Sequence, residues 1–245
     1  MGLGEAVVGA SVSVLLLLLV ALPLAYFEAP PPGFVESVAL TAVFGLAASL
    51  LALVPGLAAA LAVRRGGLLG VVSQVLYVPA VVPPTSVGVL LLASFSLPRA
   101  ACVEGVGLLC GVAAFVSGHV VNKPLGILIA MTVMALPVSF SIFDGALREE
   151  RAEAFFRSLG FSGLRLFLLL FLSLRSATVS ALVFSWIRSF GELGVLLIFA
   201  SYPMTASIYI YQTWLTHGIG PAVGASLVVM AVVMALAFVV RRWLS

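Results

Sequence analysis

The chain has 245 residues, of which 63% are hydrophobic and 9% are charged, and its formal net charge is +3. Its mean hydropathy is +1.28, and it contains several apolar stretches of about 18 residues or more, the length that a membrane-spanning helix needs. This composition excludes a soluble globular protein. It predicts an all-α polytopic membrane protein, because lipid offers irregular backbone no hydrogen-bond partners.

Hydropathy predicts about six membrane-spanning helices. In chain order they occupy residues 7–27, 38–63, 68–95, 124–143, 176–198 and 219–240. The first stretch lacks a basic leader and is longer than a signal-peptide core, so we expect a retained span with the N-terminus in the cytoplasm. An even number of spans then returns the C-terminus to the cytoplasm. No linker or second soluble domain is visible, which predicts a single transmembrane domain over residues 1–245.

The third predicted span contains several helix-breaking residues. These are Pro79, Pro83, Pro84 and Gly88. Each interior proline removes a backbone hydrogen bond and kinks the helix. Kinked spans often line a cavity, but membrane helices also tolerate proline in general, and both interpretations stay open.

Two apolar segments do not fit a simple count of spans. A seventh span at residues 105–121 would move all later arginines to the opposite side of the membrane, so we predict a short re-entrant or interfacial element there. Residues 166–200 as one helix would measure about 50 Å, against a hydrocarbon core of about 30 Å. We therefore predict an interfacial helix at 166–174 and a separate span at 176–198.

The distribution of basic residues supports this layout, because cytoplasmic loops are enriched in arginine and lysine. External segments hold only Arg99 and Lys123 among these residues. The predicted cytoplasmic segments hold Arg64, Arg65, Arg148, Arg151, Arg157, Arg165, Arg241 and Arg242.

A charged loop at about 144–165 interrupts the apolar sequence. Its helix-forming part carries Arg148, Glu149, Arg151, Glu153 and Arg157. Each such charge would cost about 2.5–3.5 kcal/mol in the centre of a bilayer, so this helix must lie in water or against another protein. Apolar Phe155, Phe156 and Leu159 alternate with the charges, and Gly160 is a helix stop. The pattern predicts a docking helix, although these arginines are also explained by the orientation rule alone.

Signals for catalysis are weak. His119 and His217 lie far apart, without the neighbouring ligands that a metal site needs, and the chain has no Gly-Lys-Ser/Thr phosphate loop. Ser117 and His119 would point in different directions on one helix, which disfavours a catalytic pair. We therefore predict no catalytic residue, no metal site and no ATP hydrolysis by this chain.

Four segments resemble the permease subunits of ABC importers. The Glu-Ala-Ala loop of that family is similar to Glu153-Ala154-Phe155-Phe156-Arg157-Ser158-Leu159-Gly160-Phe161-Ser162. The Ala-Arg-x-Leu-Gly-Glu-Phe-Gly segment of its oxyanion branch is similar to Trp186-Ile187-Arg188-Ser189-Phe190-Gly191-Glu192-Leu193-Gly194. The Leu-Pro-x-x-x-Pro-Pro-Thr signature of that branch is similar to Val78-Pro79-Ala80-Val81-Val82-Pro83-Pro84-Thr85. An external segment of its molybdate/tungstate members is similar to Tyr202-Pro203-Met204-Thr205-Ala206. Together the resemblance covers about residues 38–240.

The resemblance implies a multi-pass subunit of the cytoplasmic membrane that imports a tetrahedral oxyanion, with tungstate or molybdate as the expected cargo. It implies a homodimer that works with two ATP-binding subunits and an extracytoplasmic oxyanion-binding protein. ATP and magnesium would be bound by the partner ATPase, and this chain would hold no cofactor. Residues 153–160 would form the coupling helix, with Phe155 or Phe156 as its apolar anchor and Glu153 and Arg157 as contacts at the rim.

Few side chains can offer polar contacts to a dianion inside the membrane. The candidate hydroxyl donors of the substrate path are Thr85, Ser86, Thr132, Ser139 and Ser141. Each of them is better explained, taken singly, as a hydrogen bond between helices or a small packing residue. Arg188 and Glu192 are four residues apart, so we expect them on one face of the fifth span, either as a gate in the substrate path or as an internal structural pair.

Cys102 and Cys110 fall in the external segment between the third and fourth spans, where a disulfide can form. We predict that they form one, the alternative being two free thiols that pack as small apolar groups. Three other functions compete with the oxyanion importer. They are import of sulfate or another anion, ion-coupled secondary transport, for which Glu192 is the only candidate membrane carboxylate, and an intramembrane enzyme, which the missing polar constellation disfavours.

Overall fold

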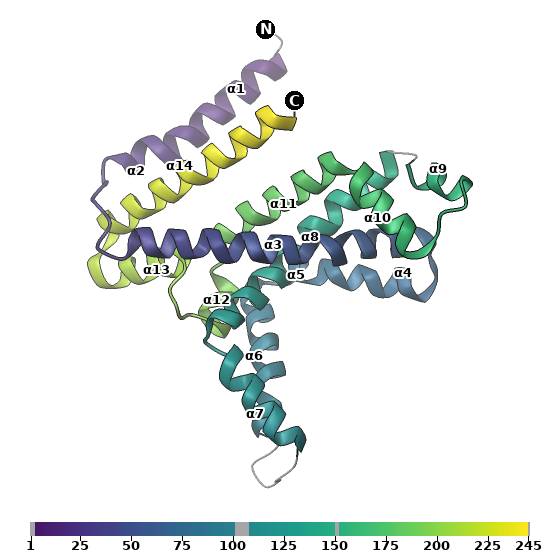
Figure 1. The fold of residues 1–245 in the computed structure, drawn as a ribbon. Coiled ribbons are helices and arrows are strands. Elements are labelled where there is room, and N and C mark those ends of the chain that lie inside the picture. The colour runs from purple at the N-terminus through teal and green to yellow at the C-terminus, as the bar shows by residue number, and fades with distance from the viewer. Residues whose placement is uncertain (1–2, 101–107, 150–151, 245) are drawn as a thin grey trace.

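The computed structural model describes residues 3–100, 108–149 and 152–244. Every regular element in these residues is a helix, as predicted, and Figure 1 shows their arrangement. The first half of the chain forms α1 (Leu3–Leu16), a π-helical turn (Leu17–Ala21), α2 (Leu22–Leu24), α3 (Phe34–Arg65), α4 (Gly67–Ser73), a 3-10 turn (Gln74–Tyr77), α5 (Val78–Val81), α6 (Pro84–Ala100) and α7 (Leu108–Val120). The second half forms α8 (Pro124–Glu149), α9 (Ala152–Ser158), α10 (Gly163–Ser173), α11 (Arg175–Phe190), α12 (Gly194–Phe199), α13 (Ala206–His217) and α14 (Ile219–Leu244).

Four helical segments of the described chain are long and apolar enough to span a membrane by themselves. They are Val7–Leu24, Phe34–Arg65, Pro124–Glu149 and Ile219–Val239. Two further apolar segments are helix pairs bent at a short break, so the total reaches six if each pair is one span. The prediction of an all-α polytopic membrane protein with about six spans is confirmed.

The core is built around α3, which packs along α8 and α11 (Figure 1). Small residues allow these helices to approach closely. A side chain at Gly56 would come within 2.9 Å of the Ser139 Cβ on α8, and one at Gly45 would come within 2.9 Å of the Ser189 Cβ on α11. Membrane helices gain little from hydrophobic burial against each other, so close packing of this kind holds the bundle together.

The third predicted span is sharply broken. Val82 has extended dihedral angles (φ −81°, ψ 143°), and the helices on its two sides are bent by 117°. Proline explains the break, because the residue before a proline avoids the helical region and the proline itself lacks an N–H donor. Pro83 and Pro84 therefore redirect the chain instead of merely kinking a rod.

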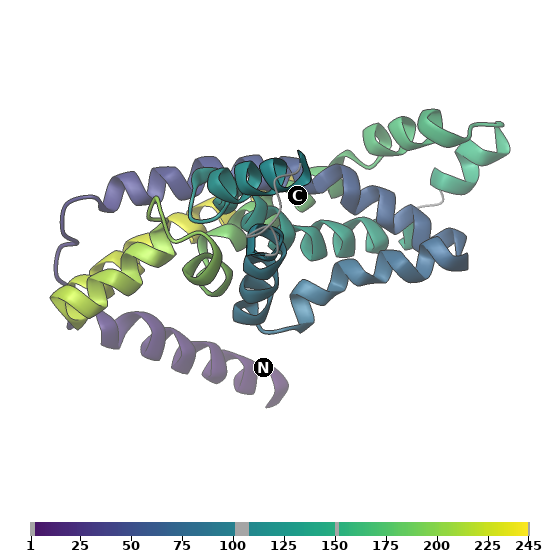
Figure 2. The same ribbon diagram turned by 90° about the horizontal axis from the view of Figure 1, so that it is seen from below.

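Helices α6 and α7 project from the bundle as a hairpin, which Figures 1 and 2 show from two sides. Helix α7 covers most of the 105–121 segment for which a re-entrant or interfacial element was predicted. It has 13 residues, fewer than the roughly 20 that a span requires. The described part of this segment is thus too short to be a seventh span.

The fifth predicted span differs from the expectation at its end. The break before it lies at Leu174, as predicted, and α10 and α11 meet there at 78°. Helix α11, however, ends at Phe190, eight residues before the predicted boundary at 198. Gly191 lies in the break that follows, where a residue without a side chain readily leaves helical geometry.

Candidate functional site

Two regions of the structure contain the predicted site residues. The first is the docking loop, residues 152–165, which lies at one end of the bundle and includes α9. The second is the helix-break junction, where the break between α5 and α6 meets the break between α11 and α12.

Helix α9 ends at a glycine stop, as the sequence predicts. Gly160 has φ +84°, a left-handed conformation that favours glycine. Its N–H donates to the Arg157 carbonyl at 2.9 Å, and the Phe161 N–H donates to the Phe156 carbonyl at 3.1 Å. These two bonds form a Schellman cap, which satisfies carbonyls that the helix end would leave free.

The two phenylalanines of α9 have different environments. Phe155 is 57% exposed, whereas Phe156 is half-buried against the core cluster of the bundle. Leu159 and Leu164 are also exposed. The loop thus presents an apolar outer surface, with Phe155 as its aromatic member, and this arrangement suits contact with another protein.

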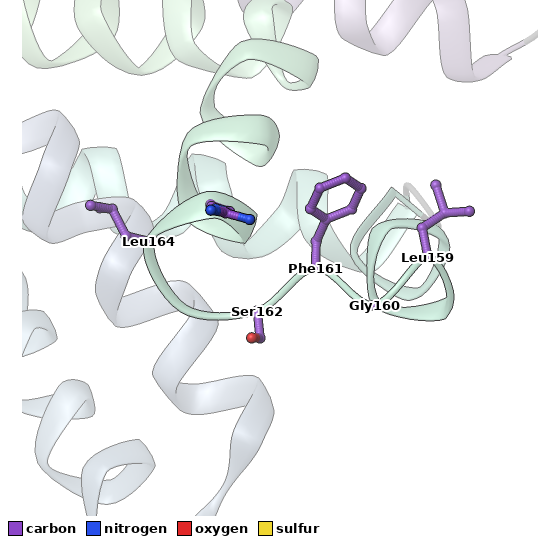
Figure 3. A pocket seen from close by; sticks show the side chains of 6 residues that line it. Leu159, Gly160, Phe161, Ser162 and Leu164 are labelled. Carbon is purple, nitrogen blue, oxygen red and sulfur yellow. The ribbon is translucent and has the colours of Figure 1, made fainter.

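A cavity of about 470 Å³ lies beside the exposed surface of the docking loop. It is lined by Leu159, Gly160, Phe161, Ser162, Leu164 and Arg165. Figure 3 shows the Leu159 and Phe161 side chains on one side of the loop and the Ser162 hydroxyl on the other. An apolar wall beside a polar group is the pattern of a surface that receives a partner's side chain.

Glu153 faces inward, although the sequence led us to expect it at the rim of a partner interface. The residue is 8% exposed. Its Oε1 accepts hydrogen bonds from Arg157 Nη2 at 2.7 Å and Nε at 2.9 Å, and its Oε2 accepts one from Arg64 Nε at 2.9 Å. The carboxylate is therefore bound within the chain, and Arg64, which sequence reasoning did not single out, is one of its partners.

Two small residues of α9 lie on its outer side. Ala154 and Ser158 are exposed. The Ser158 hydroxyl donates to the Phe155 carbonyl at 2.7 Å, so it supports the last turn of the helix. Both positions leave room for a neighbouring surface to approach α9.

The helix-break junction is organised by Glu192, which is 1% exposed. Its Oε2 lies 2.8 Å from Arg188 Nη1, and its Oε1 accepts a hydrogen bond from the Val195 N–H at 3.1 Å. The Ser207 hydroxyl donates to the Glu192 carbonyl at 2.6 Å. The predicted pairing of Arg188 with Glu192 is confirmed, but Glu192 lies beyond the end of α11 and connects three helices.

The junction brings together two of the sequence motifs that resemble the oxyanion branch. A side chain at Gly194 would come within 2.9 Å of the Pro84 Cβ and 3.2 Å of the Thr85 backbone nitrogen. Glycine is required at this position because Pro84 and Thr85, in the motif at residues 78–85, occupy the space that a side chain would need. Pro84, at the break between α5 and α6, thus packs directly on the start of α12.

A second group of polar contacts joins Asn122 to the end of α12 and the residues that follow it. Asn122 has a positive φ of 55°, and its Oδ1 accepts hydrogen bonds from Ser201 Oγ and from the Tyr202 N–H, both at 3.0 Å. Its N–H donates to the Phe199 carbonyl at 3.0 Å. Sequence reasoning missed Asn122, although a lone asparagine before Lys123 and Pro124 is a turn signal.

The candidate hydroxyl donors are not gathered in one place. Thr85 and Ser86 are exposed at the junction, whereas Ser139 is fully buried against Gly56. Thr132 donates to the Leu128 carbonyl at 2.7 Å, and Ser141 to the Pro137 carbonyl at 2.7 Å. Their role in a substrate path stays a prediction. Cys102 lies outside the described residues, and the disulfide with Cys110 also stays a prediction.

No family model matches the chain. It is similar to proteins named molybdate/tungstate transport system permease protein WtpB. The relative from Thermococcus kodakarensis is 27% identical over 218 residues, which cover 87% of this chain and 79% of that protein. The relative from Pyrococcus abyssi is 29% identical over 176 residues, 71% of this chain and 62% of its own length. The relative from Methanocaldococcus jannaschii is 32% identical over 105 residues, 42% of each chain.

The chain spans about three fifths of the Pyrococcus abyssi relative and four fifths of the Thermococcus kodakarensis relative. The resemblance to transport permeases that the sequence motifs indicate is confirmed by these relatives. Similarity to permeases and several apolar helices together identify a multi-pass membrane protein.

Proposed function

We propose that this chain, a relative of the molybdate/tungstate permease proteins, is the membrane-spanning subunit of an ATP-driven importer of a tetrahedral oxyanion. Tungstate or molybdate is the proposed cargo. Two copies of the chain form the translocation path, two ATP-binding subunits dock on them from the cytoplasm, and an extracytoplasmic binding protein delivers the anion.

The observation that carries this proposal is the outward face of the docking loop. Phe155, Leu159 and Leu164 are each more than half exposed. They belong to the docking loop, which also carries charged residues and lies at the end of the membrane bundle. The charged residues of α9 make lipid an unfavourable environment for it. An exposed aromatic side chain in such a surface is a typical interaction anchor. The two-fold arrangement offers one docking loop to each ATP-binding subunit.

Secondary transport is the less favoured alternative. It requires a membrane carboxylate that is free to bind a coupling ion or proton. Glu192 is buried, but its two oxygens already contact Arg188 and the Val195 N–H. A carboxylate held by an arginine and a backbone donor is poorly suited to bind and release a proton in each cycle.

The test is uptake by a reconstituted complex. The chain is produced together with an ATP-binding subunit and an oxyanion-binding protein from the same source, and the complex is placed in vesicles. ATP is supplied on the side of the membrane that the ATP-binding subunit faces. We expect tungstate or molybdate uptake that requires ATP, and a native mass that contains two copies of each membrane and ATP-binding subunit. Uptake that follows a sodium or proton gradient without ATP would overturn the proposal.

Cargo is resolved in the same vesicles by competition between tungstate, molybdate and sulfate. The binding protein is expected to set this selectivity, so exchanging it while keeping the membrane subunit should change the preferred anion. A preference that persists after the exchange would place selectivity in the membrane subunit.

A further inference from the structure

We propose that Arg64 and Glu153 are positioning residues that orient α9 on the end of α3, and that Glu153 makes its contribution inside this chain and not on the ATP-binding subunit. The inference rests on the proposed function, because it states how movement of a docked ATPase reaches the membrane bundle. It concerns three residues, Arg64, Glu153 and Arg157, which we call the α9 bridge.

The α9 bridge joins parts of the chain that are far apart in sequence. Arg64 lies in the last turn of α3 and Glu153 in the first turn of α9, 89 positions later. Because α3 packs along α8 and α11 at the centre of the bundle, this contact connects the docking loop to the central helix. The other oxygen of Glu153 is held by Arg157 in the next turn of α9, so the carboxylate cannot rotate freely.

The α9 bridge gives a defined orientation to the contact between α9 and the bundle, which is otherwise apolar. Phe156 and Phe161 pack under α9 against the core cluster of the bundle. Hydrophobic contact holds α9 down but has little directional preference. Charge-assisted hydrogen bonds have defined geometry, and the one from Arg64, at 2.9 Å, therefore restrains the rotation of α9 relative to α3. The two from Arg157 lie within α9 and hold the Glu153 carboxylate in the orientation that reaches Arg64.

The connection from α9 to α10 is expected to transmit movement less well than the α9 bridge does. The connection from α9 to α10 contains Gly160 and Gly163, both with positive φ (+84° and +57°), and glycine has the fewest backbone restraints of any residue. A push on Phe155 is thus transmitted to α3 most directly through Glu153 and Arg64. Loss of the α9 bridge should leave the ATP-binding subunit bound, but more ATP would be hydrolysed for each anion transported.

The experiment measures anion taken up per ATP hydrolysed in the reconstituted complex. Arg64→Gln and Glu153→Gln should each lower this ratio about threefold to tenfold, as expected for the loss of one charge-assisted contact that is partly screened by solvent. The double variant should be no worse than the more severe single variant, because both remove the same link. Arg64→Lys retains a charge at the end of α3 and should recover much of the ratio.

The matched control is Arg65→Gln, which removes an exposed arginine at the next position and should leave the ratio unchanged. Binding of the ATP-binding subunit is measured in parallel, by its dissociation constant for vesicles that contain each variant. The proposal expects wild-type affinity in both single variants. If Glu153→Gln weakens binding whereas Arg64→Gln does not, or if the losses in the double variant multiply, Glu153 contacts the partner directly and the proposal is wrong.

A second measurement separates failure of the bridge from failure of the proposed function. Spin labels are attached at Leu68→Cys and Ser158→Cys in full-length protein in which Cys102→Ser and Cys110→Ser remove the native thiols. The distance between the labels should be narrowly distributed in this background and broad after Arg64→Gln or Glu153→Gln. This outcome requires neither transport nor ATP. An unchanged distribution would show that the bridge does not orient α9, whatever the cargo of the complex.

Discussion

At the scale of single residues, Glu192 joins three helix ends at the helix-break junction. It pairs with Arg188, accepts a hydrogen bond from the Val195 N–H in the first turn of α12, and its carbonyl receives the Ser207 hydroxyl. One residue thereby holds the end of α11, the start of α12 and the start of α13. This explains why a carboxylate is kept at a site that is 1% exposed.

Replacement of Glu192 should therefore destabilise the fold. Glu192→Ala removes the hydrogen bond to Val195 and leaves the Arg188 charge without its partner. Because the Arg188 side chain is 36% exposed, we expect a loss of about 1–3 kcal/mol, less than for a fully buried pair. We expect a clear drop in the thermal unfolding midpoint of the protein in detergent. Glu192→Gln, which retains the acceptor for Val195, should cost less. Equal midpoints for the two variants would contradict the capping role.

Arg188 tests the link between this junction and transport. Arg188→Gln retains much of the shape and removes the charge, so we expect slower anion uptake in a complex that remains folded and still hydrolyses ATP, because a positive field no longer assists the dianion. Uptake at the wild-type rate would instead identify the Arg188–Glu192 pair as purely structural.

The cysteines provide a third measurement at this scale. We expect a disulfide between Cys102 and Cys110, which would link the segment after α6 to the first turn of α7 in a short closed loop. The mass of the intact protein after alkylation, with and without prior reduction, measures the free thiols. Two alkylated cysteines before reduction would rule the bond out.

At the scale of elements, α9 shows what separates an anchor from a core residue. Phe155 and Phe156 are neighbours in sequence, and their ring centroids lie 5.5 Å apart, but only Phe155 is exposed. The sequence identified the pair and left open which of the two is the anchor. The structure assigns the outward position to Phe155 and the inward position to Phe156.

Single substitutions should divide these roles. Phe155→Ala should weaken binding of the ATP-binding subunit by about 2 kcal/mol, the usual contribution of an interface anchor, without changing the thermal unfolding midpoint. Phe156→Ala should mainly lower that midpoint, because it leaves a void under α9. Binding assays and thermal unfolding on the same two variants give the answer, and the reverse pattern would reverse the assignment.

The crossing of α3 and α8 depends on a missing side chain. A Cβ at Gly56 would meet the Ser139 hydroxyl and come within 3.2 Å of the Phe140 backbone nitrogen. Gly56→Ala should therefore destabilise the protein by about 1–3 kcal/mol, as overpacking does. Ser139→Gly in the same chain should restore much of that loss by clearing the space. The unfolding midpoints of the two variants check the compensation, and an additive loss would disprove it.

At the scale of the whole molecule, the arrangement of charges makes a topology prediction. The docking loop and the end of α3 lie at one end of the bundle, and Glu153 and Arg64 meet there. We expect this end to face the cytoplasm, because it carries most of the arginines. The segment around Glu28, at the far end of α2, should face outward.

Thiol labelling in intact cells tests this orientation. In a background without Cys102 and Cys110, Glu28→Cys should react with a membrane-impermeant maleimide from outside, whereas Ser158→Cys should react only after the membrane is opened. Both positions are exposed in the structure, so lack of labelling would not reflect burial. Labelling of Ser158→Cys from outside would reverse the proposed topology.

The sequence by itself determined the elements of this protein. Hydropathy and length predict about six apolar helices, Pro83 and Pro84 predict the broken third span, and Gly160 predicts the end of α9. These features are local, because the solubility of a segment, the missing N–H of proline and the left-handed preference of glycine act within one or two turns.

Only the tertiary structure decided which elements meet. The contact of Gly194 with Pro84, the hydrogen bonds of Asn122 to Ser201 and Tyr202, and the Arg64–Glu153 pair each join residues that are far apart in the chain. The end of α11 at Phe190 also escaped prediction, since its apolar sequence continues beyond the break. Such features depend on packing between whole helices, where the space and the hydrogen-bond partners available at one segment are set by another.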